Sequence, residues 1–162
     1  MIIVSDTSPI ANLLQIDRLD LLHAIFGDVV IPPAVEHEVL ALENFNVDLA
    51  SFHKAGWIML RKPLDENAVI ALRKNLDAGE SEAIVLAHEL HADWILLDER
   101  AGTQMAESLG LQPIGLIGIL IIAKEKGLIK TVTPVVEELR TKAGFWISDK
   151  FLSRIREMVD ET

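Results

Sequence analysis

The sequence predicts an α/β sandwich built on a mainly parallel sheet of four to five strands. Three observations support this fold class. Short runs that are apolar throughout recur along the chain, helical patterns separate them, and two of the runs end in an aspartate that a helix follows. Strands buried on both faces have this continuous apolar character, and parallel strands need a long, usually helical, crossover between them.

Four apolar runs and a shorter fifth one are the expected strands. They cover residues 2–4, 29–31, 57–60, 94–97 and 112–115. Helical patterns occupy residues 9–16, 19–26, 34–43, 66–75, 80–90, 101–109, 116–126, 134–142 and 149–159. Ser8 and Pro9 have the residue types of a cap and a first helical position, so we expect the first helix to begin there.

The chain carries no repeat, low-complexity tract or linker that would divide it. We therefore expect a single domain over residues 1–162 that ends in a helical segment at about residues 133–160. No apolar run is long enough to span a membrane, and the N-terminus lacks the three regions of a signal peptide. A cytoplasmic protein without a membrane partner is the expectation.

Charge and cysteine content restrict the chemistry. Because the chain has no cysteine, disulfides, thiolate catalysis and cysteine-type zinc sites are excluded, and a metal must be held by oxygen or imidazole. The formal net charge of −10 argues against non-specific binding of nucleic acid through a basic surface. It does not argue against a nuclease, since carboxylates can hold a divalent cation that meets a phosphate. It favours a basic partner.

Two aspartates follow strands in the same way. Asp6 comes directly after the first apolar run, in "IIVSDTSPI", and Asp98 follows the run "WILL". Ligand sites of open parallel sheets lie at the carboxyl ends of the strands, which is where both side chains are expected. The alternative is structural: Asp98 would cap the next helix and Asp6 would occupy a loop. The recurrence of the pattern favours the functional interpretation.

Two helices carry paired glutamates of which one member each can face inward. At about 100° per residue, residues two apart point to nearly opposite sides of a helix. In "PPAVEHEVLALE" the apolar stripe places Glu38 inward, and in "DAGESEAIVLAHEL" it places Glu80 inward and Glu82 outward. A carboxylate on an apolar face needs a cation or hydrogen-bond donors. For Glu80, a favourable position in the first turn of a helix is the alternative explanation.

With Asp6, Glu38, Glu80 and Asp98 in this order, the chain resembles the PIN-domain family of metal-dependent ribonucleases, including VapC-like toxins. The stretches "VSDTSPI", "VVIPPAVEHEVL", "LDAGESEAIVLAHEL" and "ADWILLDERAG" carry the resemblance over the first two-thirds of the chain, and "AGFWISDKFL" is similar to the tail of a poorly characterised PIN-like subgroup. The resemblance implies a three-layer α/β/α sandwich. The third acid is commonly an aspartate in this family, whereas here a glutamate takes its place, and Glu80 and the nearby Glu82 are both candidates for it. Leu96 stands where a threonine often precedes the fourth acid.

The resemblance implies hydrolysis of RNA phosphodiester bonds with Mg²⁺ or Mn²⁺, the hard cations that suit oxygen ligands. It assigns catalysis and metal binding to the same four acids. Asp6 and Asp98 are expected as direct ligands, while Glu38 and Glu80 complete the cluster or orient the attacking water. The implied biological role is the toxin of a type II toxin–antitoxin pair, with an antitoxin whose basic segment enters the acidic site and with a homodimer as a further assembly.

Two other functions fit parts of the sequence. A PIN-like module without activity would keep the fold and serve in binding or regulation. A phosphatase with an aspartyl nucleophile also places an aspartate after its first strand, but it needs a second aspartate two residues later, where Ser8 stands. The segment "RKPLDENAVIALRKN" holds the best local basic cluster for backbone phosphates, although a solvated helix face explains it equally well.

Overall fold

The computed structural model describes residues 1–162 and confirms the predicted fold class. Five strands pair in parallel in one sheet, in the order β3-β2-β1-β4-β5. They are β1 (Ile3–Ser5), β2 (Val29–Ile31), β3 (Ile58–Leu60), β4 (Trp94–Leu96) and β5 (Pro113–Ile114). The short, apolar runs of the sequence are therefore the strands of this sheet, with the buried runs β1, β2 and β4 inside it and β3 and β5 at its edges.

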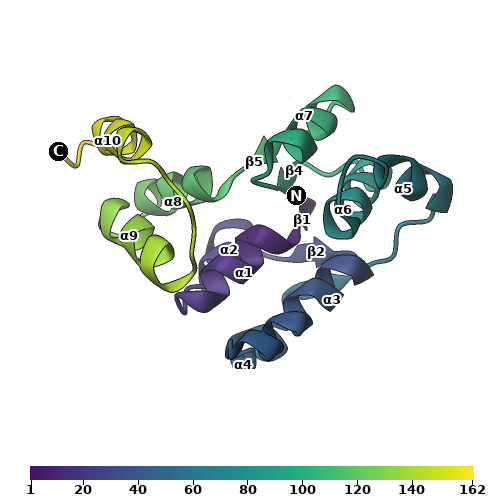
Figure 1. Ribbon diagram of the computed structural model, residues 1–162, viewed down its shortest axis with the longest axis horizontal. Coiled ribbons are helices and arrows are strands. Elements are labelled where there is room, and N and C mark those ends of the chain that lie inside the picture. Colours follow the sequence, from purple (N-terminus) through teal and green to yellow (C-terminus); the bar gives the residue numbers. More distant parts are fainter.

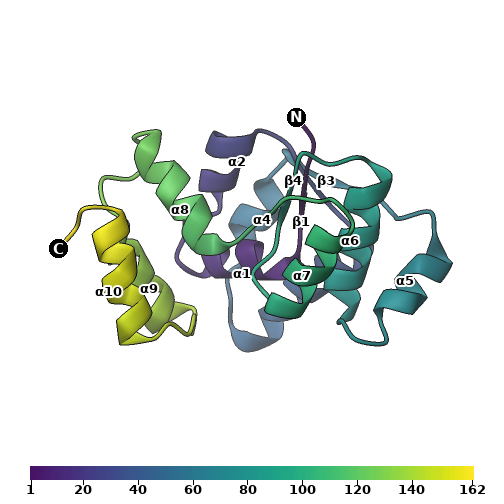
Figure 2. The same cartoon turned by 90° about the horizontal axis from the view of Figure 1, so that it is seen from above.

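Helices connect the strands and continue beyond the last one. They are α1 (Thr7–Gln15), α2 (Asp20–Phe26), α3 (Pro33–Leu40), the 3-10 helix η1 (Ala41–Phe45), α4 (Ala50–Lys54), α5 (Glu66–Leu72), α6 (Ala78–Glu89), α7 (Arg100–Ser108), α8 (Leu116–Glu125), α9 (Thr133–Lys142) and α10 (Asp149–Met158). Helices α3 and α6 pack together on one side of the sheet, and α2 packs against α8 on the other (Figure 1). Both views place α8, α9 and α10 at the end of the molecule opposite α5 (Figure 2).

The strand order creates a switch point at β1. The chain leaves β1 towards β2 and β3, then returns to place β4 on the other side of β1, where Ser5 pairs with Leu96. The connections that follow β1 and β4 thus diverge to opposite sides of the sheet. Ligands of open α/β sheets bind in the crevice that such a reversal leaves at the carboxyl ends of the strands.

One hydrophobic core joins the sheet to the C-terminal helices. The same cluster of buried side chains contains Ile3 of β1, Ile95 of β4, Leu139 of α9 and Ile155 of α10, none of them accessible to solvent. Burial of such side chains stabilises a fold by about 1.5–3 kcal/mol each. The C-terminal helices are consequently part of the packed body. None of the helices has the length and hydropathy needed to cross a membrane.

Two local expectations were wrong. Helix α1 begins at Thr7 with Asp6 in the N-cap position, so Ser8 lies inside the helix and does not cap it. Pro9 is tolerated there because the first-turn amides have no partner within the helix. The helix expected over residues 34–43 ends at Leu40 and continues as η1, and α4 was not predicted. Elements of about one turn leave too few residues for a periodic pattern.

Candidate metal centre

Asp6 is buried at the carboxyl end of β1. It is 4 % exposed, and although it holds the N-cap position of α1, its side chain makes no capping hydrogen bond. Burial raises the pKa of its carboxyl to about 7, with further upward contributions from Asp77 and Glu38 and an opposing one from the Thr7 amide. The carboxylate is therefore held in place by the fold for a purpose other than capping.

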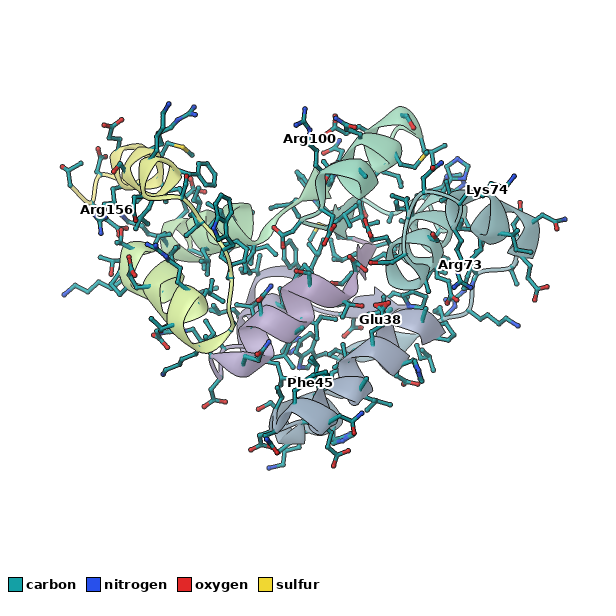
Figure 3. The ribbon with its side chains drawn as sticks, viewed as in Figure 1. Glu38, Phe45, Arg73, Lys74, Arg100 and Arg156 are labelled. Carbon is teal, nitrogen blue, oxygen red and sulfur yellow. The ribbon has the colours of Figure 1, made fainter.

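Glu38 reaches this position from α3 and is held by two donors. The Thr7 hydroxyl donates to Oε2, and the backbone N–H of Gly79 donates to Oε1 at 3.2 Å. A Cβ atom on Gly79 would lie only 2.9 Å from Oε1, so this position of α6 has to be glycine for the carboxylate to fit. Glu38 lies where α1, α3 and α6 meet, near the middle of Figure 3.

Asp77 is a member of the cluster that sequence reasoning missed. It is the N-cap of α6, where its side chain accepts a hydrogen bond from the Glu80 amide at 2.8 Å. One carboxylate oxygen each from Asp6, Glu38 and Asp77 lie within 4.8 Å of one another. The spacing Asp-x-x-Glu is a helix-capping signature, and that role alone explains the residue in the sequence. Its approach to Asp6 and Glu38 is visible only in the structure.

Glu80 lies behind this group as the inward member of its pair. It is 4 % exposed, and its buried Oε2 atom has no hydrogen-bond partner. Burial, a hydrogen bond with the Asp77 carboxyl and the charges of Asp77 and Asp6 raise the pKa of Glu80 to about 8. Glu82 instead accepts a hydrogen bond from the Ala34 amide at 3.1 Å and stabilises the first turn of α3. Helical periodicity predicted this division between the two glutamates.

Asp98 follows β4 but is engaged differently from the other acids. Its Oδ1 atom accepts the Leu116 amide at 2.8 Å, while the buried Oδ2 atom has no partner. Burial raises the pKa of its carboxyl, the hydrogen bond from Leu116 lowers it, and the charge of Glu99 raises it. The side chain does not cap α7, whose N-cap position is Glu99. Asp98 is outside the group of oxygens that approach within 4.8 Å of one another. We expected four acids to converge, and the structure brings together Asp6, Glu38 and Asp77, with Glu80 beside them.

The donor set suits a hard divalent cation. All the ligand atoms on offer are carboxylate oxygens, which Mg²⁺ and Mn²⁺ prefer. Five acids line the site: Asp6, Glu38, Asp77, Glu80 and Asp98. None of them forms an ion pair with a lysine or arginine. Asp6 and Glu80 are buried, whereas Asp77 is exposed. A buried carboxylate without a counter-charge is costly unless it binds a cation or a proton. The partnerless Oε2 atom of Glu80 fits this requirement.

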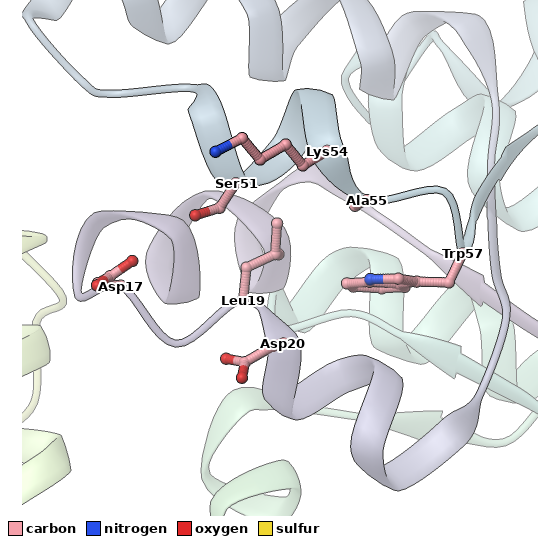
Figure 4. A pocket seen from close by; sticks show the side chains of 7 residues that line it. All are labelled: Asp17, Leu19, Asp20, Ser51, Lys54, Ala55 and Trp57. Carbon is pink, nitrogen blue, oxygen red and sulfur yellow. The ribbon is translucent and has the colours of Figure 1, made fainter.

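A separate pocket lies near the amino ends of the strands, opposite the acidic site. It has a volume of about 390 Å³ and is lined by residues of the α1–α2 turn, α4 and the segment before β3, among them Asp17, Lys54 and Trp57 (Figure 4). The indole of Trp57 stacks on His23 at 5.3 Å between ring centroids. Because Trp57 precedes β3 at its amino end, this pocket is not part of the acidic site.

Comparison with known proteins decides the family. A model of the family described as DUF3368, PIN domain, matches residues 2–161. The chain is a PIN domain. Five solved protein chains also match. One is a PilT N-terminus domain protein from the hyperthermophilic archaeon Sulfolobus solfataricus P2, which is 21 % identical, with a TM-score of 0.50 over 74 % of this chain and 90 % of that chain. This likeness supports the PIN fold. No curated protein matches the sequence.

The family membership explains the location of the acids. PIN domains are typically metal-dependent nucleases, and this PIN domain has an acidic group that could hold a cation at the carboxyl edge of its parallel sheet. The four acids predicted from the sequence, Asp6, Glu38, Glu80 and Asp98, all come from elements that end or begin at that edge.

Proposed function

We propose that this PIN domain is an endoribonuclease that hydrolyses RNA phosphodiester bonds with Mg²⁺ or Mn²⁺. The observation that carries the proposal is the approach of three carboxylate oxygens, from Asp6, Glu38 and Asp77, within 4.8 Å of one another, without any basic side chain paired to them. A structural role would pair these charges, whereas a metal centre needs them free.

In this proposal some residues bind the cation and others orient the ligands. Asp6, Glu38 and Asp77 hold the cation, while the Thr7 hydroxyl and the Gly79 amide fix the orientation of Glu38. A bound Mg²⁺ or Mn²⁺ supplies the positive charge that activates water and stabilises the charge developing on the phosphate.

Glu80 and Asp98 have supporting roles in this proposal. Glu80, whose pKa burial raises to about 8, can hold or release a proton beside the carboxylates that bind the cation. Asp98 is anchored by the Leu116 amide and keeps Oδ2 for a water molecule or a further bond to the cation.

Cleavage of RNA by the purified chain tests the proposal. Structured and single-stranded RNAs are incubated with Mg²⁺, with Mn²⁺ and with EDTA, and the fragments are resolved by electrophoresis. Cleavage that EDTA abolishes and that Asp6→Asn loses is the expected result. A folded wild-type chain that binds Mn²⁺ but cleaves none of these RNAs favours the inactive binding module instead.

We further propose that the chain is the toxin of a type II pair whose antitoxin carries a basic segment. A guanidinium can pair bidentately with a carboxylate and take the place of the cation. The net charge of −10 and the uncompensated acids support this partner. Calorimetry of a co-encoded protein against wild type and Asp98→Asn, with and without Mn²⁺, tests it: binding should weaken on both changes, and indifference to both means that the partner docks elsewhere.

We also propose that residues 1–162 act as a single PIN domain, with the C-terminal helices as an integral part. The core that Ile3 and Ile155 share supports this. Limited proteolysis should therefore release no stable fragment that lacks α9 and α10.

A further inference from the structure

Two basic side chains without acidic partners follow α5, the helix that packs against α6. Arg73 and Lys74 follow the end of α5 and precede Asp77 by only four and three residues. Both are exposed, and neither forms an ion pair. Figure 3 shows them on the α5 side of Glu38. In a chain with a net charge of −10, free cations this close to the acids require an explanation.

A groove begins beside these cations. It has a volume of about 280 Å³ and lies between the first turn of α3, the segment after β3, and α5. Its apolar walls come from four side chains, Pro33, Pro63, Val69 and Ile70. Ile70 is 63 % exposed although it is a large apolar side chain. Pro33 at the start of α3 and Glu82 on the outward face of α6 complete the lining.

Of the charged side chains that line the groove, one basic residue has no acidic partner. Lys62 pairs with Glu66 at 3.5 Å, and Glu82 is occupied by the Ala34 amide at 3.1 Å. Arg73 is the remaining charged group of the lining and has no partner. A guanidinium in this state is suited to bidentate contact with a phosphate.

We propose that the single-stranded RNA passes from the metal centre over this groove, with Arg73 and Lys74 bound to the phosphates next to the scissile one. The proposal rests on the proposed function. A divalent cation at the acids can meet only the reacting phosphate, so the neighbouring phosphates need their own cations in a protein that otherwise repels RNA. The groove then receives the adjacent nucleotide between apolar walls, and the pair Arg73 and Lys74 positions the strand.

Equilibrium binding tests this without requiring catalysis. Fluorescence anisotropy of a labelled, mixed-sequence, single-stranded RNA in EDTA gives the Kd of wild type and of the double variant Arg73→Gln/Lys74→Gln at several salt concentrations. The matched control is Lys126→Gln/Lys130→Gln, which removes the same charge from two exposed, unpaired lysines after α8. Melting curves check that every variant is folded.

The double variant should bind RNA about 10-fold more weakly than the control. The slope of log affinity against log salt concentration should fall by about 1.4, because each lost phosphate contact on a single strand removes about 0.7. Ile70→Glu should also weaken binding, whereas Leu128→Glu, at another exposed apolar side chain, should not.

Equal Kd values and equal salt slopes in the double variant and its control would overturn the proposal. RNA binding that survives while the variant loses a co-encoded acidic protein would also overturn it and would assign the cations to that protein. The proposed function has a separate readout, since wild type that binds RNA through Arg73 and Lys74 but does not cleave it with Mn²⁺ contradicts only the nuclease activity.

Discussion

Buried carboxylates occur in two regions of this PIN domain, and their surroundings are opposite. Near the C-terminus, Glu161 accepts hydrogen bonds from the Lys124 ammonium and from the Val132 and Thr133 amides, each at 2.8 Å. Burial alone would raise its pKa, but these donors lower it to about 2. At the metal centre, burial and neighbouring acids raise the pKa of Asp6 to about 7.

This is the difference expected between a structural carboxylate and one that binds a metal. Glu161 ties the end of the chain to α8 and to the first turn of α9, and its charge is fully compensated. Asp6 and Glu80 are more deeply buried and lack any counter-charge, so a cation or a proton must compensate them. Substitutions in the two regions should therefore have different consequences for activity, metal binding and pH dependence.

The largest expected effect is on cleavage. Asp6→Asn should lower the rate of RNA cleavage by on the order of 10²–10³-fold, because it removes a charged group that acts only in the site. Glu161→Gln should lower stability by about 1–3 kcal/mol through weaker hydrogen bonds but leave the rate of the folded protein unchanged. Single-turnover assays below both melting temperatures measure this. Equal loss of activity in the two variants would contradict the division between the regions.

The next effect is stabilisation by metal. At a Mn²⁺ concentration of 100 times Kd, wild type should gain about 2.7 kcal/mol, or roughly 5–10 °C in Tm. Glu161→Gln should show the same gain from a lower starting temperature, and Asp6→Asn should lose most of it. Differential scanning fluorimetry with Mn²⁺ and with EDTA measures both. A gain that persists in Asp6→Asn means that Asp6 holds no metal.

The two regions should respond to pH in opposite directions. The folded-state pKa values of Asp6 and Glu80 are raised to about 7 and 8, so their contribution to stability is present below about pH 4 and is lost as pH rises to 8. The lowered pKa of Glu161 gives stability above about pH 4.5 that is lost as pH falls towards 2. For one group, a difference of one pKa unit between the folded and the unfolded chain changes the free energy of unfolding by about 1.4 kcal/mol.

Urea unfolding in EDTA between pH 3 and 9 measures this dependence. Stability should be highest at about pH 4, and Asp6→Asn should remove part of the alkaline loss and be more stable than wild type above pH 7. Glu161→Gln should flatten only the acidic side. A metal-free wild type that grows more stable from pH 5 to 8 would show that the site is not strained by its own charge.

The smallest expected effect distinguishes the two roles of Asp77. Asn caps helices as well as Asp does, so Asp77→Asn should keep α6 intact while weakening Mn²⁺ binding by about 10-fold. Asp65→Asn is the matched control, because Asp65 caps α5 through the Ala68 amide at 3.0 Å and lies outside the acidic group. Calorimetric titration with Mn²⁺ compares them. Unchanged affinity in Asp77→Asn leaves Asp77 with its capping role alone.

Much of the fold could be predicted because its signals are local. The apolar runs that became β1, β2, β3 and β4 are fully visible in the sequence, as are the amphipathic helices. The order of the strands is not local, since nothing in a run such as residues 94–96 says that it pairs with β1. The short helix α4 and the start of α1 were missed because one turn carries no periodicity and because capping residues compete over a few positions.

The sequence by itself determined which acids could serve the site: Asp6 and Asp98 by their position after strands, and Glu38 and Glu80 by the faces of their helices. Tertiary structure decided which of them meet, and it added Asp77, because distances between side chains on different elements depend on how α1, α3 and α6 pack. The same holds for Gly79, whose missing side chain makes room for Glu38, and for Glu161, whose partner amides lie 28 and 29 residues earlier in the chain. A local pattern can place a carboxylate on a surface of its own element, but only the packed fold determines whether a cation, an amide or another carboxylate lies opposite.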